Sequence, residues 1–69
     1  MLIKKINRRE AEEIIEKREP IGLFYIISKE KSDKIYIGID NKNGNAWTEE
    51  FKSLYYCKRW LMGNFEVND

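Results

Sequence analysis

The sequence predicts an α+β domain: a small antiparallel sheet of three to four strands with two helices on one face, in the order β-α-β-β-β-α. Two observations lead to this prediction. A hairpin signal occupies the middle of the chain, and a segment with helical periodicity flanks it on each side. Since 69 residues can build one core but not two, residues 1–63 are expected to form a single domain and residues 64–69 a loose C-terminal tail.

A short strand is predicted near the N-terminus, followed by a helix that begins at Arg8. Asn7 is a suitable N-cap for this helix, and Glu10 stands at the third helical position, where it completes a capping box. Pro20 disfavours helical geometry in the residue before it. The helix should therefore end near residues 17–18.

Three strands are predicted next, as an antiparallel meander over residues 22–28, 34–40 and 47–51. The first of them is apolar on both sides, which is typical of a central strand, and the sequence leaves open which side faces the helices. A type I turn over residues 41–44, with Gly44 in the left-handed conformation, is expected to join the last two strands.

The geometry of this turn sets the register of the hairpin. A two-residue loop at Asn43 and Gly44 would pair Asp40 with Trp47 and would set apolar residues against charges. The four-residue turn instead pairs Ile39 with Trp47, and this register is preferred because it gathers apolar side chains on one face. The side chains that it brings together are those of Ile35, Ile39, Trp47 and Phe51.

The last helix is expected to be capped by Ser53 and stopped by Gly63. One face of this helix is apolar and should contact the sheet, and both Trp47 and Trp60 are expected to be buried. An alternative starts the helix after Thr48, which would remove the third strand of the meander. The apolar face consists of Leu54, Cys57, Trp60 and Leu61.

The order of helix, three-stranded meander and helix resembles the topology of double-stranded-RNA-binding domains. Two motifs of that family are missing. No Gly-Pro-x-His occurs in residues 29–33, and residues 53–57 read Ser-Leu-Tyr-Tyr-Cys where the family has Lys-Lys-x-Ala-Lys. The resemblance therefore concerns topology and transfers no binding residue to this chain.

Four runs in the C-terminal half of the chain resemble small uncharacterised proteins that phages and prophages of low-GC Gram-positive bacteria encode. These runs are residues 36–41, 44–47, 50–53 and 58–61. The resemblance implies a short accessory or regulatory protein, and it carries over no catalytic residue.

The composition argues against several classes of function. Thirteen Lys and Arg against twelve Asp and Glu give a formal charge of +1, which is not the balance of a strongly basic polyanion-binding protein. With no His and a single Cys, neither a zinc site nor another cofactor nor enzyme activity is expected, and Cys57 should be a buried apolar residue. No stretch is long enough to span a membrane, and the short, charged N-terminus does not resemble a signal peptide, which indicates a cytoplasmic protein.

These observations favour a small non-catalytic protein-interaction module that binds a protein partner or a second copy of itself. The expected interface is the sheet face opposite the helices, centred on Tyr36, with Gly38 allowing close approach. The strand over residues 22–28 contributes one of its two alternating sets of side chains to that face. The candidate interface residues are Phe24, Ile26, Tyr36, Gly38 and Thr48, with Leu23, Tyr25 and Ile27 in place of the first two if the other set points outward.

Nucleic-acid binding is the alternative function. It would use the basic residues near the N-terminus, together with aromatic side chains for stacking on bases. Acidic residues follow these basic ones directly in the sequence, which weakens the electrostatic case. The candidate nucleic-acid contacts are Lys4, Lys5, Arg8 and Arg9, and the acidic neighbours are Glu10, Glu12 and Glu13.

Overall fold

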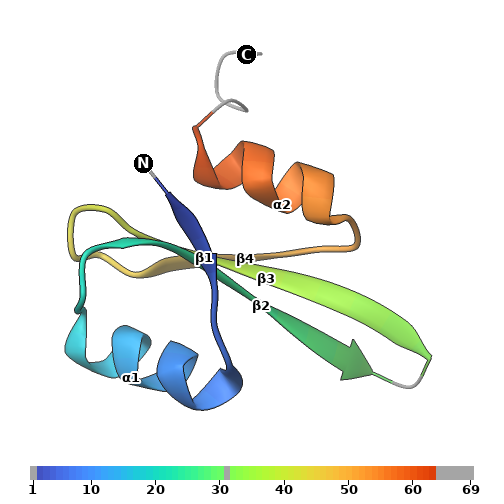
Figure 1. The fold of residues 1–69 in the computed structure, drawn as a ribbon, viewed down its shortest axis with the longest axis horizontal. Helices are drawn as coiled ribbons and strands as arrows, with labels where there is room; N and C mark the ends of the chain where they lie inside the picture. The colour runs from blue at the N-terminus through green and yellow to red at the C-terminus, as the bar shows by residue number, and fades with distance from the viewer. Residues whose placement is uncertain (1, 31, 64–69) are drawn as a thin grey trace.

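The computed structural model describes residues 2–30 and 32–63, and the predicted tail over residues 64–69 lies outside this part of the chain. The described residues form a four-stranded sheet and two helices, which confirms the α+β class and the predicted order of elements (Figure 1). The elements are β1 (Ile3–Lys5), α1 (Arg8–Lys17), β2 (Gly22–Glu30), β3 (Asp33–Asn41), β4 (Trp47–Phe51) and α2 (Leu54–Leu61).

Helix α1 begins and ends where the sequence predicts. The side chain of Asn7 accepts a hydrogen bond from the backbone N–H of Glu10 (2.8 Å), and the Glu10 carboxylate accepts one from the backbone N–H of Asn7 (3.0 Å). This capping box satisfies two backbone donors that the first turn would otherwise leave free. At the other end Arg18 adopts a left-handed conformation and donates its N–H to the carbonyl of Ile14 (2.7 Å), which closes the helix.

The sheet is mixed, whereas the sequence predicted an antiparallel one. Strands β2, β3 and β4 form the predicted antiparallel meander, but β1 lies beside β2 and runs parallel to it. The reason is that α1 carries the chain from β1 back to the start of the adjacent strand, and such a crossover makes the two strands parallel.

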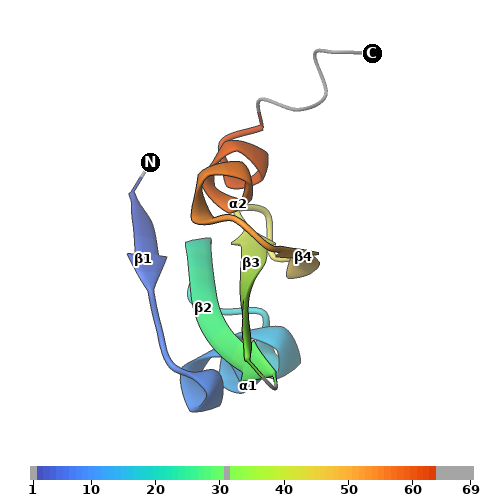
Figure 2. The same cartoon turned by 90° about the vertical axis from the view of Figure 1, so that its right-hand side faces the viewer.

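Both helices pack on the sheet as predicted, but they lie on opposite faces of it and not together on one face (Figure 2). Successive side chains of β2 point to opposite sides, and both sides are apolar, so each side supports a helix. On one side, α1 buries Ala11 and Ile14 against Phe24, Ile26 and Ile39. On the other side, α2 buries Cys57 and Leu61 against Leu23, with Tyr25, Tyr36 and Phe51 partly covered.

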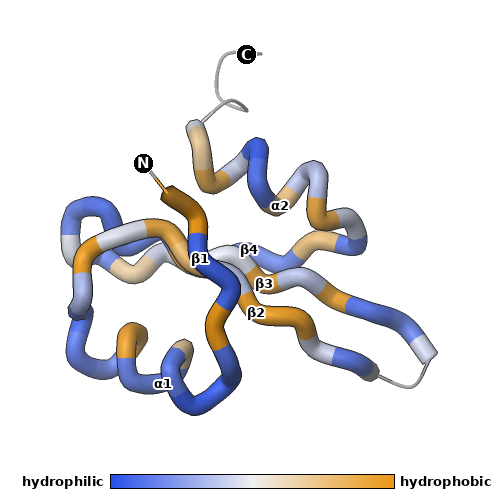
Figure 3. Tube along the Cα trace, viewed as in Figure 1, coloured by the Kyte–Doolittle hydropathy of each residue, from blue (hydrophilic) through white to orange (hydrophobic). Residues whose placement is uncertain are grey.

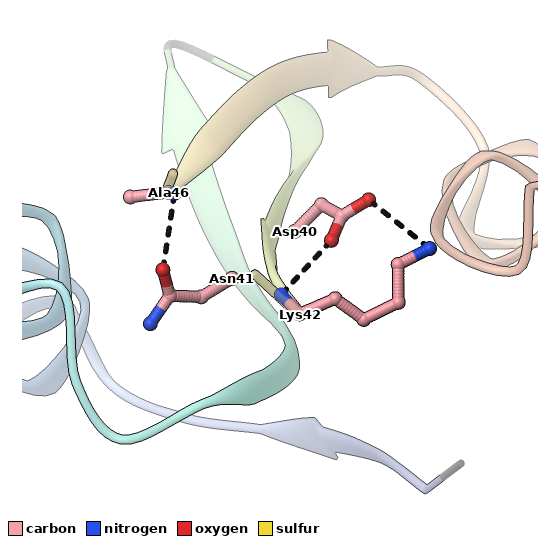
Figure 4. A network of polar contacts seen from close by, with 4 residues as sticks. All are labelled: Asp40, Asn41, Lys42 and Ala46. Atoms are coloured by element: carbon pink, nitrogen blue, oxygen red, sulfur yellow. Dashed lines mark hydrogen bonds and ion pairs between the residues drawn. The ribbon is translucent and has the colours of Figure 1, made fainter. Parts of the chain in front are cut away.

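The hairpin of β3 and β4 has the register that the sequence argument rejected. The predicted turn is present: the Gly44 N–H donates to the Asn41 carbonyl (3.4 Å), and Gly44 has a φ of 81°. The loop continues through Ala46, however, and this extension pairs Asp40 with Trp47. The Asn41 side chain holds the extension in place because its Oδ1 accepts the Ala46 N–H (3.0 Å; Figure 4).

This register changes the position of one tryptophan. Trp47 is 63% exposed at the start of β4, so the prediction that it is buried was wrong. Trp60 is half-buried, and its ring lies 5.8 Å from that of Phe51, centroid to centroid. The alternative in which the last helix begins after Thr48 is also excluded, because β4 continues to Phe51 and Ser53 caps α2.

Candidate interaction surface

The five residues of the predicted interface do not form one surface. Phe24 and Ile26 are buried beneath α1, whereas Tyr36 and Gly38 lie beneath α2 on the opposite side of the sheet. Thr48 is exposed on β4, where it is paired with Ile39 on the α1 side. Each face of the sheet carries a helix, so neither is the helix-free face that the prediction required.

Gly38 does permit a close approach to its backbone, as the sequence indicated, and the approaching element is α2. A Cβ atom built on Gly38 would lie 3.2 Å from the sulfur of Cys57 and 3.2 Å from two ring carbons of Trp60. These distances are shorter than an ordinary van der Waals contact. Gly38 therefore sets how closely α2 packs on the sheet, and its role lies in the core.

The N-terminal basic residues do not gather into one patch either. Lys4 and Lys5 point to opposite sides of β1 because side chains alternate along a strand. Arg8 donates to the hydroxyl of Ser28 (3.1 Å) over the α1 side of the sheet, and Arg9 is exposed on α1. Lys4 borders a hollow of about 180 Å³ that also has acidic residues in its wall. These acidic residues are Glu10, Glu13 and Glu19.

The outer face of α2 carries a stripe of large side chains, three of which are exposed. Tyr55, Arg59 and Met62 follow one another at intervals of four and three residues, which places them on one side of the helix, and Tyr56 lies beside them. Tyr55 is 61% exposed, Tyr56 51% and Met62 55%. We call Tyr55, Tyr56, Arg59 and Met62 the α2 stripe.

Contacts within the α2 stripe hold part of it in a defined arrangement. The guanidinium of Arg59 donates to the hydroxyl of Tyr55 (3.3 Å) and lies 5.6 Å from the centre of the same ring. The rings of Tyr55 and Tyr56 meet edge to face, with their centres 5.2 Å apart. Such contacts reduce the side-chain freedom that a ligand would have to remove on binding.

The surface around the α2 stripe is basic. Residues 51–63 contain Lys52, Lys58 and Arg59 and no acidic residue. By contrast, residues 8–19, which include α1, contain four basic and five acidic residues. The α2 side of the sheet also carries two acidic residues, Asp40 and Glu49, since Glu49 pairs with Gly38 and Asp40 alternates with Gly38 along β3. Asp40 forms an ion pair with Lys42 (3.8 Å). The excess of basic residues therefore belongs to the segment that carries the α2 stripe and not to the whole face.

The α2 stripe was not among the residues predicted from the sequence. The sequence does contain a signal for it, because Tyr55 and Tyr56 are large aromatic residues that fall outside the apolar inner face of the last helix. To predict that these side chains are exposed, one must know what covers each side of the helix. That depends on where α2 lies on the sheet.

Cys57 is the one residue of the described part with a clearly shifted pKa. Its side chain is fully buried, and this burial raises the pKa of the thiol to about 11, against a smaller opposing effect of the Lys58 ammonium. A thiol with this pKa is a poor nucleophile at neutral pH, since the thiolate is the reactive form. Within residues 2–30 and 32–63, no group of three or more His, Cys, Asp and Glu is arranged to hold a metal ion.

Comparison of the chain with protein-family models, with curated proteins and with solved structures finds no match. No helix in the described part of the chain is long and apolar enough to cross a membrane. The α2 stripe and the basic charge around it therefore provide the main evidence about function.

Proposed function

We propose that the protein is a small non-catalytic interaction module that binds a protein partner through the α2 stripe. The observation that supports this proposal is the exposure of two Tyr and one Met, with the half-buried Arg59 beside them, on the outer side of a helix whose opposite face is packed in the core. Tyr, Arg and Met are enriched at protein interfaces, and Tyr and Arg are enriched among the residues that dominate binding energy.

The proposed partner is an acidic protein surface. The basic charge of residues 51–63 favours a partner of opposite charge and increases its rate of association. A second copy of this chain is a poorer ligand, because a two-fold contact between α2 helices would place Lys58 and Arg59 of one copy beside those of the other. We therefore favour a different protein over the homodimer.

The proposal includes a biological setting. The resemblance to small phage and prophage proteins supports an accessory or regulatory role, exercised in the cytoplasm. An accessory role of this kind requires a binding surface, and the one thiol of the domain is buried in the core, away from that surface.

The test is a comparison of variants in which one exposed side chain is removed. Immobilised wild-type protein should capture an acidic protein from a lysate of the source cells, and that partner should then be purified for measurement of its Kd. Tyr55→Ala should weaken the Kd about tenfold or more, because it removes an exposed aromatic anchor without disturbing the core.

Two matched controls lie on α1. Ile15→Ala also removes an exposed apolar side chain from a helix, and Arg9→Glu makes on α1 the same reversal of charge that Arg59→Glu makes on α2. Both α1 variants should bind the purified partner like the wild type, and Arg59→Glu should bind it more weakly. Equal binding by all four variants would refute the proposal, as would a wild-type protein that forms a stable dimer through α2.

A further inference from the structure

The end of the β2–β3 hairpin contains an open hollow lined with lysines. The hollow has a volume of about 540 Å³, and Figure 3 shows hydrophilic residues on both strands near this end of the hairpin. Its wall consists of Lys29, Ser32, Asp33, Lys34, Tyr36 and Lys52. Among the described side chains, the wall therefore contributes three ammonium groups against one carboxylate, a net charge of +2.

Two of the lysines are placed where they repel each other. Lys29 and Lys34 are direct partners in the β2–β3 register, so their side chains project from adjacent strands on the same side of the sheet. Like charges in this position destabilise a sheet. The structure gives an ion pair between Lys42 and Asp40 and none to Lys29 or Lys34 from a described residue. A bound anion would relieve the repulsion.

The hollow adjoins the α2 stripe. Lys52 lines the hollow and lies one residue before Ser53, the N-cap of α2, so the first turn of α2 begins beside it. Tyr55 and Tyr56 belong to that first turn. In Figure 1 the tip of the β2–β3 hairpin and the start of α2 lie at the same end of the molecule. One partner could therefore contact both.

We infer that the hollow binds a phosphorylated side chain of the protein partner that contacts the α2 stripe. The inference rests on the proposed function, since it concerns the same partner. A phosphomonoester carries a charge of −1.5 to −2 at neutral pH, which matches the net +2 of the hollow. A nucleic-acid phosphate is a diester with a single negative charge, so each one matches the hollow less well.

The test uses phenyl phosphate as the probe and follows amide chemical shifts of the isotope-labelled full chain. Shifts should concentrate at Lys29, Lys34 and Lys52 at pH 7.5 and give a Kd at least tenfold lower than that of dimethyl phosphate, which is a diester. At pH 5 phenyl phosphate is mostly a monoanion, so its affinity should fall about tenfold. A Kd that is the same for the monoester and the diester would overturn the inference.

Variants locate the site. Lys29→Gln and Lys34→Gln should each weaken phenyl phosphate binding about fivefold or more, whereas Lys17→Gln, which makes the same change on α1, should leave it unaltered. Shifts spread evenly over all lysines would mean non-specific attraction and would overturn the inference. Tight binding of a dT oligonucleotide at the hollow without phenyl phosphate binding would assign the hollow to nucleic acid and would also overturn it.

The same measurements separate this inference from the proposed function. Tyr55→Ala should lose the protein partner but still bind phenyl phosphate, because Tyr55 does not line the hollow. If phenyl phosphate fails to bind while Tyr55→Ala still loses the partner, the phosphate inference fails alone. If phenyl phosphate binds and Tyr55→Ala keeps the partner, the proposed function fails.

Discussion

The side chain of Asn41 connects two loops at one end of the molecule. It is fully buried, and it is the one buried polar residue of the described part. Its Nδ2 donates to the Pro20 carbonyl (2.9 Å), and its Oδ1 accepts from the Ala46 N–H (3.0 Å). The amide thus joins the segment after α1 to the β3–β4 loop, and both of its functional groups are satisfied.

Asn41→Ala should therefore destabilise the fold. Removal of the amide leaves the Pro20 carbonyl and the Ala46 N–H without their partners, and an unsatisfied buried group costs about 1–3 kcal/mol. Urea unfolding followed by tryptophan fluorescence would measure the change. Asn43→Ala, in the exposed part of the same loop, is the control and should have little effect. A change below about 0.5 kcal/mol for Asn41→Ala would show that the amide is dispensable.

Cys57 yields a second prediction at the scale of a residue. Since burial raises its pKa from the ordinary value of 9.0 to about 11, its thiolate fraction at pH 8 is about 100-fold lower than that of a free thiol. Iodoacetamide should label the native protein at least that much more slowly than the protein in urea. Equal labelling rates in the two states would contradict the burial of this residue.

The same pKa difference makes stability depend on pH. The folded pKa lies above the unfolded one, so the unfolded chain ionises first as the pH rises. The stability that the neutral thiol contributes is complete below about pH 9 and is lost as the pH rises toward 11. The free energy of unfolding of a Cys57→Ser variant should decrease less over this pH range than that of the wild type. An equal decrease in the two proteins would mean that other groups cause the pH dependence.

At the scale of the element, sequence signals between neighbouring residues predicted the helix ends correctly, whereas the pairing of β3 with β4 depends on a longer-range contact and was not predicted. The cap of α1 at Asn7, the cap of α2 at Ser53 and the left-handed Gly63 all depend on residues a few positions apart, and the structure confirms them. The β3–β4 register depends on the bond from Ala46 to the Asn41 side chain, five residues away, which no turn rule includes. The turn was thus predicted at the right residues, while the pairing beyond it was off by one.

The lysine pair of the β2–β3 hairpin supplies a prediction about this element. Lys34→Glu places a carboxylate opposite Lys29 and replaces repulsion by attraction, so it should raise the free energy of unfolding by about 0.2–1 kcal/mol. The gain should shrink in 1 M salt, because salt screens exposed charges. Lys34→Gln removes the repulsion alone and should give a smaller gain. If Lys34→Glu unfolds as readily as the wild type or more so, the lysine pair imposes no strain.

At the scale of the whole molecule, the main error concerned the side of the sheet that each helix covers. The apolar pattern of β2 indicated that both faces of this strand could be buried, and a binding partner was expected on the second face. The structure places α2 there instead, with Gly38 leaving room for Cys57 and Trp60. Tyr36 and Gly38, the centre of the predicted interface, therefore lie beneath α2, and the exposed aromatic surface lies one layer further out, on α2 itself.

The position of the candidate site could not be predicted for the same reason. Helical spacing separates the inner and outer sides of the last helix, but it does not reveal whether the outer side is covered. The hollow at the hairpin end depends equally on tertiary structure, because Lys52 reaches Lys29 and Lys34 from beyond β4. In the sequence these three lysines are separated, and no pattern indicates that they line one hollow.

The central claim is that the α2 side of the molecule is its binding surface. The most direct measurement is a map of amide chemical-shift changes when the labelled protein is titrated with its purified acidic partner. The account predicts that the largest changes fall on residues 52–63 and on the end of the β2–β3 hairpin, with α1 unaffected. Changes concentrated on α1, with residues 52–63 unchanged, would contradict it.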